Sequence, residues 1–301
     1  MFRRNVILCY HRVAEGVDDP FGISVSPANF AAQLEELQKV AEISTLDELS
    51  TSGRRRRVVV TFDDGYADNL WQAMPIAKAK GVPMTVYVTS GRIDDHRGFW
   101  WDRMSAIFGR RPEAVHEVEL SLSSGPVRVP IGARGTGADL SAVRSHLLPL
   151  PVAEIERVLD DVADSWSVSR AADPDARSLT TVELAQLAAE DVVTIGAHTV
   201  DHPRLADRPA EEQHLSVSES KAELEQRLGR RVDHFAYPYG GTDAFDDRTV
   251  AAVRQAGFST ACTTLPGSAE ASSDPLRLPR RIAADWGRLR FRAQMLRWGL
   301  L

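Results

Sequence analysis

The sequence contains little cysteine and no long apolar segment. Only Cys9 and Cys262 are present among 301 residues, so a disulfide framework and a CxxC metal knuckle are both excluded. This usage is typical of a reducing compartment. No stretch reaches the length of a membrane span, and the apolar run before His11 is shorter than the core of a signal peptide. The chain as written therefore indicates a cytoplasmic protein without a transmembrane segment. Removal of an export signal from a precursor stays an open alternative.

The chain also lacks an excess of positive charge. Its formal net charge is −6 and its pI is about 5.8, so the overall charge does not favour a nucleic-acid partner. The proportions of apolar and charged residues are those of an ordinary globular protein. A chain of 301 residues is long enough for one large α/β domain with a sizeable core. The sequence leaves the oligomeric state open.

Short apolar runs alternate with helical patterns along the chain. Ser26-Pro27 predicts a helix start, Thr180 to Glu183 reads as a capping box, and Gly257 is placed to end another helix. This alternation predicts an α/β fold with a parallel sheet or barrel, whose chemistry lies at the carboxyl ends of the strands. The expected strands are Val6–Cys9, Val58–Phe62, Met84–Val88, Val192–Ala197, His234–Ala236 and Thr260–Thr263, and two further expected helices are Ala210–Leu228 and Asp246–Ala256.

The alternation stops between Gly91 and Ser178. This stretch contains FWWDRM, a Gly-rich polar segment at Ser121–Gly137 and an expected helix at Pro151–Asp164. We expect a single domain over residues 1–301 that carries an insertion of helix and loop at residues 92–178. Trp100 and Trp101 in the insertion could stack on sugar rings, because aromatic faces suit the apolar face of a pyranose. The alternative is that they anchor the insertion to the barrel.

Two adjacent carboxylates, Asp63 and Asp64, end an apolar run in the stretch VVVTFDDGYADN. One aspartate before a glycine is ordinary turn chemistry. Two of them at the end of a buried strand repel each other, so they need either a charge partner or a function.

A pair of histidines, His198 and His202, follows another expected strand in IGAHTVDHPRL. On a helical turn, residues four apart share a face, so both imidazoles could bind one ion. Two imidazoles and one carboxylate would make a three-ligand site with an open position, as in catalytic zinc sites. The second aspartate could then accept a proton from a water beside the ion. Spacing alone does not say which aspartate has which role.

An aromatic turn, Tyr237-Pro238-Tyr239-Gly240, lies in the stretch RVDHFAYPYGG. Proline fixes such a turn, and glycine lets a ligand approach the backbone. A backbone N–H here could face a developing oxyanion, and Tyr237 and Pro238 could line the substrate site. A tight aromatic turn without a function is the alternative.

Together the three stretches resemble a known family. TFDDG, HTVDH and FAYPYG are similar to the first three motifs of the polysaccharide deacetylases, the carbohydrate esterases that include the NodB-like enzymes. The resemblance covers about residues 5–90 and 178–285 and includes the phrases SKAELEQRLG and AGFSTACTT. The early Tyr-His stretch LCYHRV is similar to the start of the biofilm-polysaccharide N-deacetylases.

The resemblance implies a distorted (β/α) barrel of about seven strands and one divalent ion, usually zinc, with cobalt and nickel as alternatives. It implies that Asp63 is the general base and that Asp64, His198 and His202 are the ligands. The family reaction removes an acetyl group, usually from an N-acetylhexosamine. The Tyr239 amide would help to hold the oxyanion, and a protonated histidine would release the amine.

Two positions depart from the family pattern. Ala236 stands where the family has an arginine that orients the base, and no histidine follows His234 to serve as the general acid. In a closed barrel the first and last strands are neighbours, so His11 could supply the acid and Arg280 the orienting cation. A hydrogen-bonded core histidine and a surface ion pair are the respective alternatives.

The sequence therefore predicts a metal-dependent hydrolase that removes N-acetyl groups from an amino-sugar-containing polysaccharide or glycan precursor. The alternatives are a carbohydrate O-acetyl esterase, a small-molecule amidohydrolase on the same barrel, and a non-catalytic glycan-binding protein. A non-haem iron oxygenase uses the same ligand set, but it needs no second carboxylate and belongs on a different scaffold.

Overall fold

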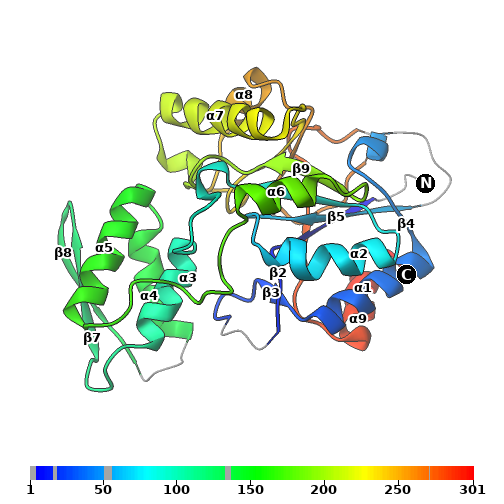
Figure 1. Cartoon of the computed structure of the whole chain (residues 1–301). Helices are drawn as coiled ribbons and strands as arrows, with labels where there is room; N and C mark the ends of the chain where they lie inside the picture. The colour runs from blue at the N-terminus through cyan, green and yellow to red at the C-terminus, as the bar shows by residue number, and fades with distance from the viewer. Residues whose placement is uncertain (1–4, 16–18, 51–55, 133–136, 271) are drawn as a thin grey trace. The chain divides into compact units, whose positions relative to one another are not determined.

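A parallel sheet forms the centre of the larger part of the chain (Figure 1). The structure is a computed structural model that describes residues 5–15, 19–50, 56–132, 137–270 and 272–301. Seven strands are hydrogen-bonded in one order, and the short β4 (Glu42–Ile43) also pairs with β5. That order is β11 (Thr260–Cys262), β10 (His234–Ala236), β9 (Val193–Ala197), β6 (Met84–Val88), β5 (Arg57–Phe62), β1 (Val6–Tyr10) and β12 (Arg281–Ile282).

The segment before β12 closes this sheet into a distorted barrel. Leu278 pairs with Cys262 of β11, and the Thr263 amide donates to the Leu278 carbonyl at 2.8 Å. Three residues further on, Arg281 pairs with Leu8 of β1 in parallel register. One short stretch thus connects both edges of the sheet. The expected barrel of about seven strands is confirmed, and so is the expectation that the first and last strands are neighbours.

The strands are buried on both faces because apolar layers cover them inside and outside. A small cluster fills the barrel interior, and a larger one lies between the sheet and the helices. Strands β1 and β6 accordingly read as continuous apolar runs rather than alternating ones. The interior cluster contains Ile7, Leu46, Val59, Tyr87, Ala236, Cys262, Ala269 and Leu278.

Helices surround the sheet, and their ends follow the local sequence signals. Ser26 caps α1, and Thr180 forms the predicted capping box with Glu183. Gly257 follows α8 with a φ of 76°. The helices of this part are α1 (Pro27–Val40), α2 (Met74–Ala79), α6 (Thr181–Ala188), α7 (Ala210–Leu228), α8 (Asp247–Gln255) and α9 (Arg288–Arg297). The strands β2 (Arg12–Val13) and β3 (Ser24–Val25) make a separate small pair.

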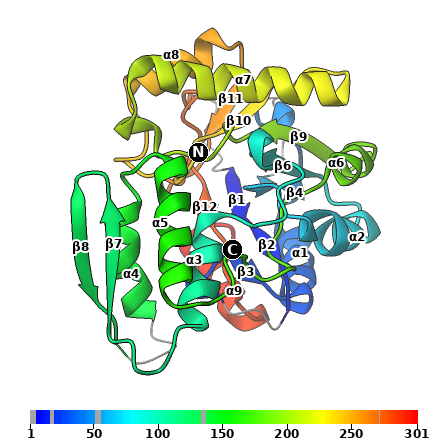
Figure 2. The same cartoon turned by 60° about the vertical axis from the view of Figure 1, so that its left-hand side comes forward.

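Asp94–Ser178 lies in a second compact unit. It contains α3 (Trp100–Gly109), β7 (Glu117–Leu122), β8 (Gly125–Pro130), α4 (Gly137–Leu147) and α5 (Val152–Ser165), and Figure 2 shows the hairpin of β7 and β8 beside α5. The predicted helix at Pro151–Asp164 corresponds to α5. The polar segment Ser121–Gly137 was expected to be irregular, but β8 lies within it. Burial alternates along β7, which is the pattern of a strand with one covered face.

None of the helices that the structure describes is long and apolar enough to span a membrane.

Candidate active site

Most of the candidate residues lie just beyond the carboxyl ends of neighbouring strands. Asp63 and Asp64 follow β5, and His11 follows β1. His198 follows β9, and the aromatic turn that contains Tyr239 follows β10. Parallel strands end at one edge of the barrel, so side chains that are far apart in the sequence meet there.

The two aspartates face different partners. Both are 3% exposed, yet Asp63 contacts Arg280 while Asp64 lies beside His198 and His202. The backbone turns sharply at this point, because Asp64 has a φ of 74° and Gly65 a φ of 79°. The neighbouring carboxylates therefore do not have to share one cation.

Asp64, His198 and His202 form a compact donor set. The Asp64 Oδ1 atom lies 3.5 Å from His198 Nε2 and 3.3 Å from His202 Nε2. The His198 Nδ1 atom lies 2.7 Å from the Ala236 carbonyl oxygen, so it donates its proton there and leaves Nε2 as the coordinating atom. One ligand atom from each residue lies within 4.8 Å of the others. One carboxylate and two imidazoles at this separation fit a divalent ion of the zinc type.

The histidines converge through a tight turn and not through the predicted helical turn. Thr199 and His202 both have left-handed backbone, with φ values of 66° and 62°. The Thr199 hydroxyl accepts a hydrogen bond from the His202 amide at 3.1 Å. Left-handed conformations are costly for these residue types, and strained backbone of this kind is concentrated at functional sites. The two imidazoles lie together as predicted, but the prediction that a helical turn brings them together was wrong.

The electrostatics of this donor set suit a cation. Burial alone would raise the pKa of Asp64, but its contacts with the His198 and His202 imidazoles keep that pKa well below its usual range. Burial lowers the pKa of His202, which favours a neutral imidazole with a lone pair. An ionised carboxylate and neutral imidazoles are the forms that bind metal.

Arg280 holds Asp63 through a two-point ion pair inside the barrel. The Nη1–Oδ1 and Nη2–Oδ2 distances are both 2.6 Å, and the Arg280 side chain is 0% exposed. Arg280 also donates to the Thr61 hydroxyl and to the Thr263 carbonyl. Burial would raise the pKa of Asp63, but the Arg280 charge and hydrogen bonds lower it to about 2. The Asp63 carboxylate is therefore ionised and fixed in orientation.

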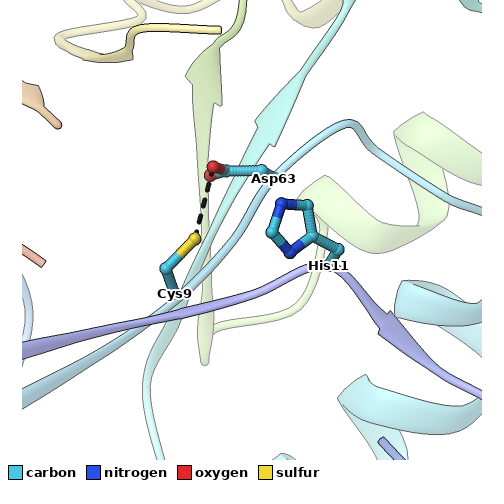
Figure 3. A group of neighbouring side chains, drawn as sticks. All are labelled: Cys9, His11 and Asp63. Atoms are coloured by element: carbon cyan, nitrogen blue, oxygen red, sulfur yellow. Dashed lines mark hydrogen bonds between the residues drawn. The ribbon is translucent and has the colours of Figure 1, made fainter. Parts of the chain in front are cut away.

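Cys9 is a neighbour of Asp63 that the sequence interpretation missed. Figure 3 shows the Cys9 thiol and the His11 ring beside Asp63, and the Cys9 Sγ–Asp63 Oδ2 distance is 3.4 Å. Burial raises the pKa of Cys9, so the group is a thiol that donates to the carboxylate. Cys9 and His11 are two positions apart at the end of a strand, and such residues share a face. This spacing was the available signal that Cys9 lies near the site.

Cys9, His11 and Asp63 also place ligand atoms within 4.8 Å of one another. A second cation there is disfavoured, because the Arg280 guanidinium already occupies both carboxylate oxygens of Asp63 with its positive charge. The thiol form of Cys9 is also a poor ligand. We therefore assign the donor set of Asp64, His198 and His202 as the candidate metal site.

The aromatic turn divides its two tyrosines between different environments. Tyr239 is half-buried with a φ of 62°, and its ring lies 4.7 Å from that of His202. Tyr237 is fully buried; its hydroxyl donates to the Leu276 carbonyl at 2.8 Å and its ring stacks on Phe245. Pro238 lies between them and is buried. The expectation that the Tyr237 side chain lines the substrate site is therefore not kept, because that side chain is part of the core.

The two tryptophans of the insertion lie inside its own unit. Trp100 is 1% and Trp101 7% exposed, and the Trp101 ring stacks on Phe99 at 4.6 Å. Their surfaces are used in packing within the unit. We therefore do not keep the expectation that they stack on a sugar ring.

The family of the chain follows from comparison with known proteins. The family model described as polysaccharide deacetylase matches residues 50–121 and 162–261, which is more than half of the chain. No curated protein matches. The chain therefore belongs to the polysaccharide deacetylase family, whose members act on acetylated glycans, and it is a carbohydrate deacetylase, a hydrolase.

Solved structures share this fold over nearly the whole chain. IcaB from Ammonifex degensii is 19% identical with a TM-score of 0.62, and the alignment covers 99% of this chain and 98% of that one. The deacetylase PplD of Streptococcus pyogenes, solved in complex with acetate, is 18% identical with a TM-score of 0.61 and 98% coverage of both chains. The polysaccharide deacetylase BC0361 of Bacillus cereus is 17% identical with a TM-score of 0.62, over 97% of this chain and 69% of that one.

Proposed function

We propose that this chain is a metal-dependent N-deacetylase that acts on an amino-sugar-containing polysaccharide or glycan precursor. The observation that carries the proposal is the division of two adjacent aspartates between a histidine pair and a buried arginine. This arrangement supplies a cation site and a separately held carboxylate base at one strand end. Metal-assisted amide hydrolysis uses both of these functions.

Asp64, His198 and His202 would hold the ion, which we take to be zinc, with cobalt and nickel as alternatives. When bound, the ion would polarise the acetyl carbonyl and lower the pKa of a water. Three protein ligands leave a coordination position for substrate or water, as catalytic sites require. The hydrogen bond from His198 to Ala236 would fix the ligand tautomer.

Asp63 is the general base in this proposal. Its pKa of about 2 keeps it ionised near neutral pH, and Arg280 fixes the direction of both oxygens. It would accept a proton from the attacking water. Ala236 stands at the position of the family's orienting arginine. Arg280 would take over the role of that arginine. It reaches the same carboxylate from the closing segment of the barrel.

Tyr239 would stabilise the oxyanion, and His11 would protonate the leaving amine. The Tyr239 backbone N–H would donate to the oxyanion, which is supported by the left-handed turn beside His202. His11 would give a proton to the leaving amine. Its half-buried ring lies close to Asp63 at the end of β1, on the side of the barrel where β1 pairs with the last strand.

The test is acetate release from a panel of acetylated glycans and small amides, after chelation and return of zinc, cobalt or nickel. We expect release from N-acetylated amino-sugar oligomers, loss on chelation and recovery with the ion. Release from O-acetylated sugars alone would favour the esterase alternative. Release from small amides alone would favour the amidohydrolase, and oligosaccharide binding without release would favour the glycan-binding protein.

A further inference from the structure

The short turn that carries His11 is held by side chains from the loop after the two aspartates. Asn69 Nδ2 donates to the His11 carbonyl oxygen at 2.9 Å. Asp68 Oδ2 accepts from Arg12 Nε at 2.9 Å, and Asp68 Oδ1 accepts from the Val13 amide at 3.2 Å. Three consecutive residues, 11 to 13, are therefore each bonded to Asp68 or Asn69. We call this pair of side chains the clamp.

The clamp is buried and internally connected. Asn69 is 0%, Arg12 4% and Asp68 8% exposed. Asn69 Nδ2 also donates to Asp68 Oδ1 at 3.1 Å, so one amide group supplies a hydrogen to each acceptor. The Arg12 guanidinium lies 4.9 Å from the centre of the Tyr66 ring, which restricts the ion pair further. Asn69, Asp68 and Arg12 each have at least one partner in this buried network, which restricts their positions.

The clamp lies in the same chain segment as the proposed base, Asp63, and it is bonded to the proposed acid, His11. Asp63 and Asn69 belong to the same segment, six residues apart, and that segment also contains Asp64. The His11 ring is only half-buried, and it lies with Asp63 and Cys9 in one group (Figure 3). The position of a half-buried ring depends in part on the backbone that carries it. The atom that Asn69 holds is the carbonyl oxygen of that residue.

We propose that Asn69, assisted by Asp68, positions the His11 ring for proton transfer to the leaving group. This inference rests on the proposed function, because it takes His11 as the general acid. Asn69 is a positioning residue that acts through His11. Its contribution should depend on the leaving group, since an amine must be protonated to leave whereas an activated aryl oxide leaves without help.

The experiment compares an amide with an activated ester in the full chain loaded with zinc. The substrates are an N-acetylglucosamine oligomer and 4-nitrophenyl acetate, and the variants are Asn69→Ala, Asn69→Leu and His11→Ala. We expect Asn69→Ala to lower kcat for the amide by roughly tenfold or more, with KM and ester hydrolysis changed by no more than about twofold. Asn69→Leu, which keeps the volume without the donors, should behave in the same way. Asn29→Ala removes an asparagine hydrogen bond to Asp285 at an exposed position and should leave both rates unchanged.

The outcomes separate the clamp from the proposed acid. If His11→Ala loses amide hydrolysis selectively and Asn69→Ala does not, then the positioning role of Asn69 is overturned and the assignment of His11 as the acid stands. If Asn69→Ala lowers amide and ester hydrolysis equally, its role is structural only and the inference is overturned. If His11→Ala lowers amide and ester hydrolysis equally, then the assignment of His11 as the acid and the positioning role of Asn69 both fail. Should Asn69→Ala not fold, Asp68→Asn provides the same comparison, because it removes the charge that holds Arg12 and keeps an acceptor for Val13.

Discussion

Asp63 and Asp64 are adjacent in the chain, but their surroundings differ in the kind of positive charge that each carboxylate faces. Asp63 pairs with Arg280, which is part of the chain and permanently charged. Asp64 faces two imidazoles whose coordinating atoms are directed at one point. One carboxylate is thus neutralised by a side chain of the chain itself, while the other, in the proposed function, would be neutralised by a bound metal ion.

This difference explains how two like charges can lie at one strand end. Without positive partners, one of them would be expected to bind a proton, because close carboxylates raise each other's pKa. Separate partners keep both ionised, as the lowered pKa of each indicates. A base can then remain available beside a metal ligand.

The largest effect should come from removing the base alone. Asp63→Asn keeps the shape of the side chain but cannot accept a proton, so we expect acetate release to fall by about 10²-fold to 10⁴-fold. Zinc content should stay at the wild-type level, because Asp63 is not a ligand in this account. Activity within about tenfold of the wild type would assign the base elsewhere.

Removal of the arginine tests the other half of the comparison. Arg280→Met leaves a buried carboxylate without its partner, and breaking such a pair costs about 3–5 kcal/mol of unfolding free energy. Arg280→Lys keeps the charge but not the two-point geometry, so it should retain more stability than Arg280→Met and less activity than the wild type. Urea unfolding and acetate release measure both. Equal stability of Arg280→Met and the wild type would contradict a buried pair.

A third aspartate of the same loop should show the opposite dependence on pH. Burial raises the pKa of Asp68 to about 6, although the Arg12 charge opposes this. An unfolded aspartate titrates near 3.9, so the folded state binds the proton more tightly and gains stability below about pH 4. That gain is lost as the pH rises through 6. Between pH 4 and 7 the unfolding free energy of the wild type should fall relative to Asp68→Asn by up to about 3 kcal/mol, measured by urea unfolding.

The smallest effect should come from the thiol beside the base. Cys9→Ala removes one weak donor to Asp63, worth about 1 kcal/mol, so kcat should fall by roughly fivefold. Cys9→Ser restores a donor of similar size and should recover most of the rate. A matched change at the other buried cysteine, Cys262→Ala, leaves the Asp63 hydrogen bond intact and serves as the control. Equal losses for Cys9→Ala and Cys9→Ser would mean that packing, and not the donor, matters.

Much of the fold and the ligand set could be predicted because local signals are strong there. Apolar runs gave the strands within one or two residues, and the capping box at Thr180 was found as predicted. The hairpin of β7 and β8 was not predicted, since its polar residues give only a weak strand pattern. Burial of Tyr237 was also missed, because an aromatic turn looks the same in sequence whether its rings face the core or the solvent.

The two partners of Asp63 differ in this respect: the closure of an expected barrel suggested Arg280, whereas nothing in the sequence interpretation suggested Cys9. Arg280 lies 217 residues from Asp63, and only closure of the barrel brings them together. Cys9 reads as an apolar strand residue, and its contact with Asp63 depends on the pairing of β1 with β5. Such contacts are set by tertiary structure, so a local pattern can suggest a candidate residue but cannot identify its partner.

The most direct test of the account is zinc content per chain after loading and removal of free metal, compared between Asp63→Asn and Asp64→Asn. We predict that the wild type and Asp63→Asn each retain one zinc ion and that Asp64→Asn retains much less. If Asp64→Asn holds zinc as the wild type does, or if Asp63→Asn loses it, then the two carboxylates do not have the separate roles described for them.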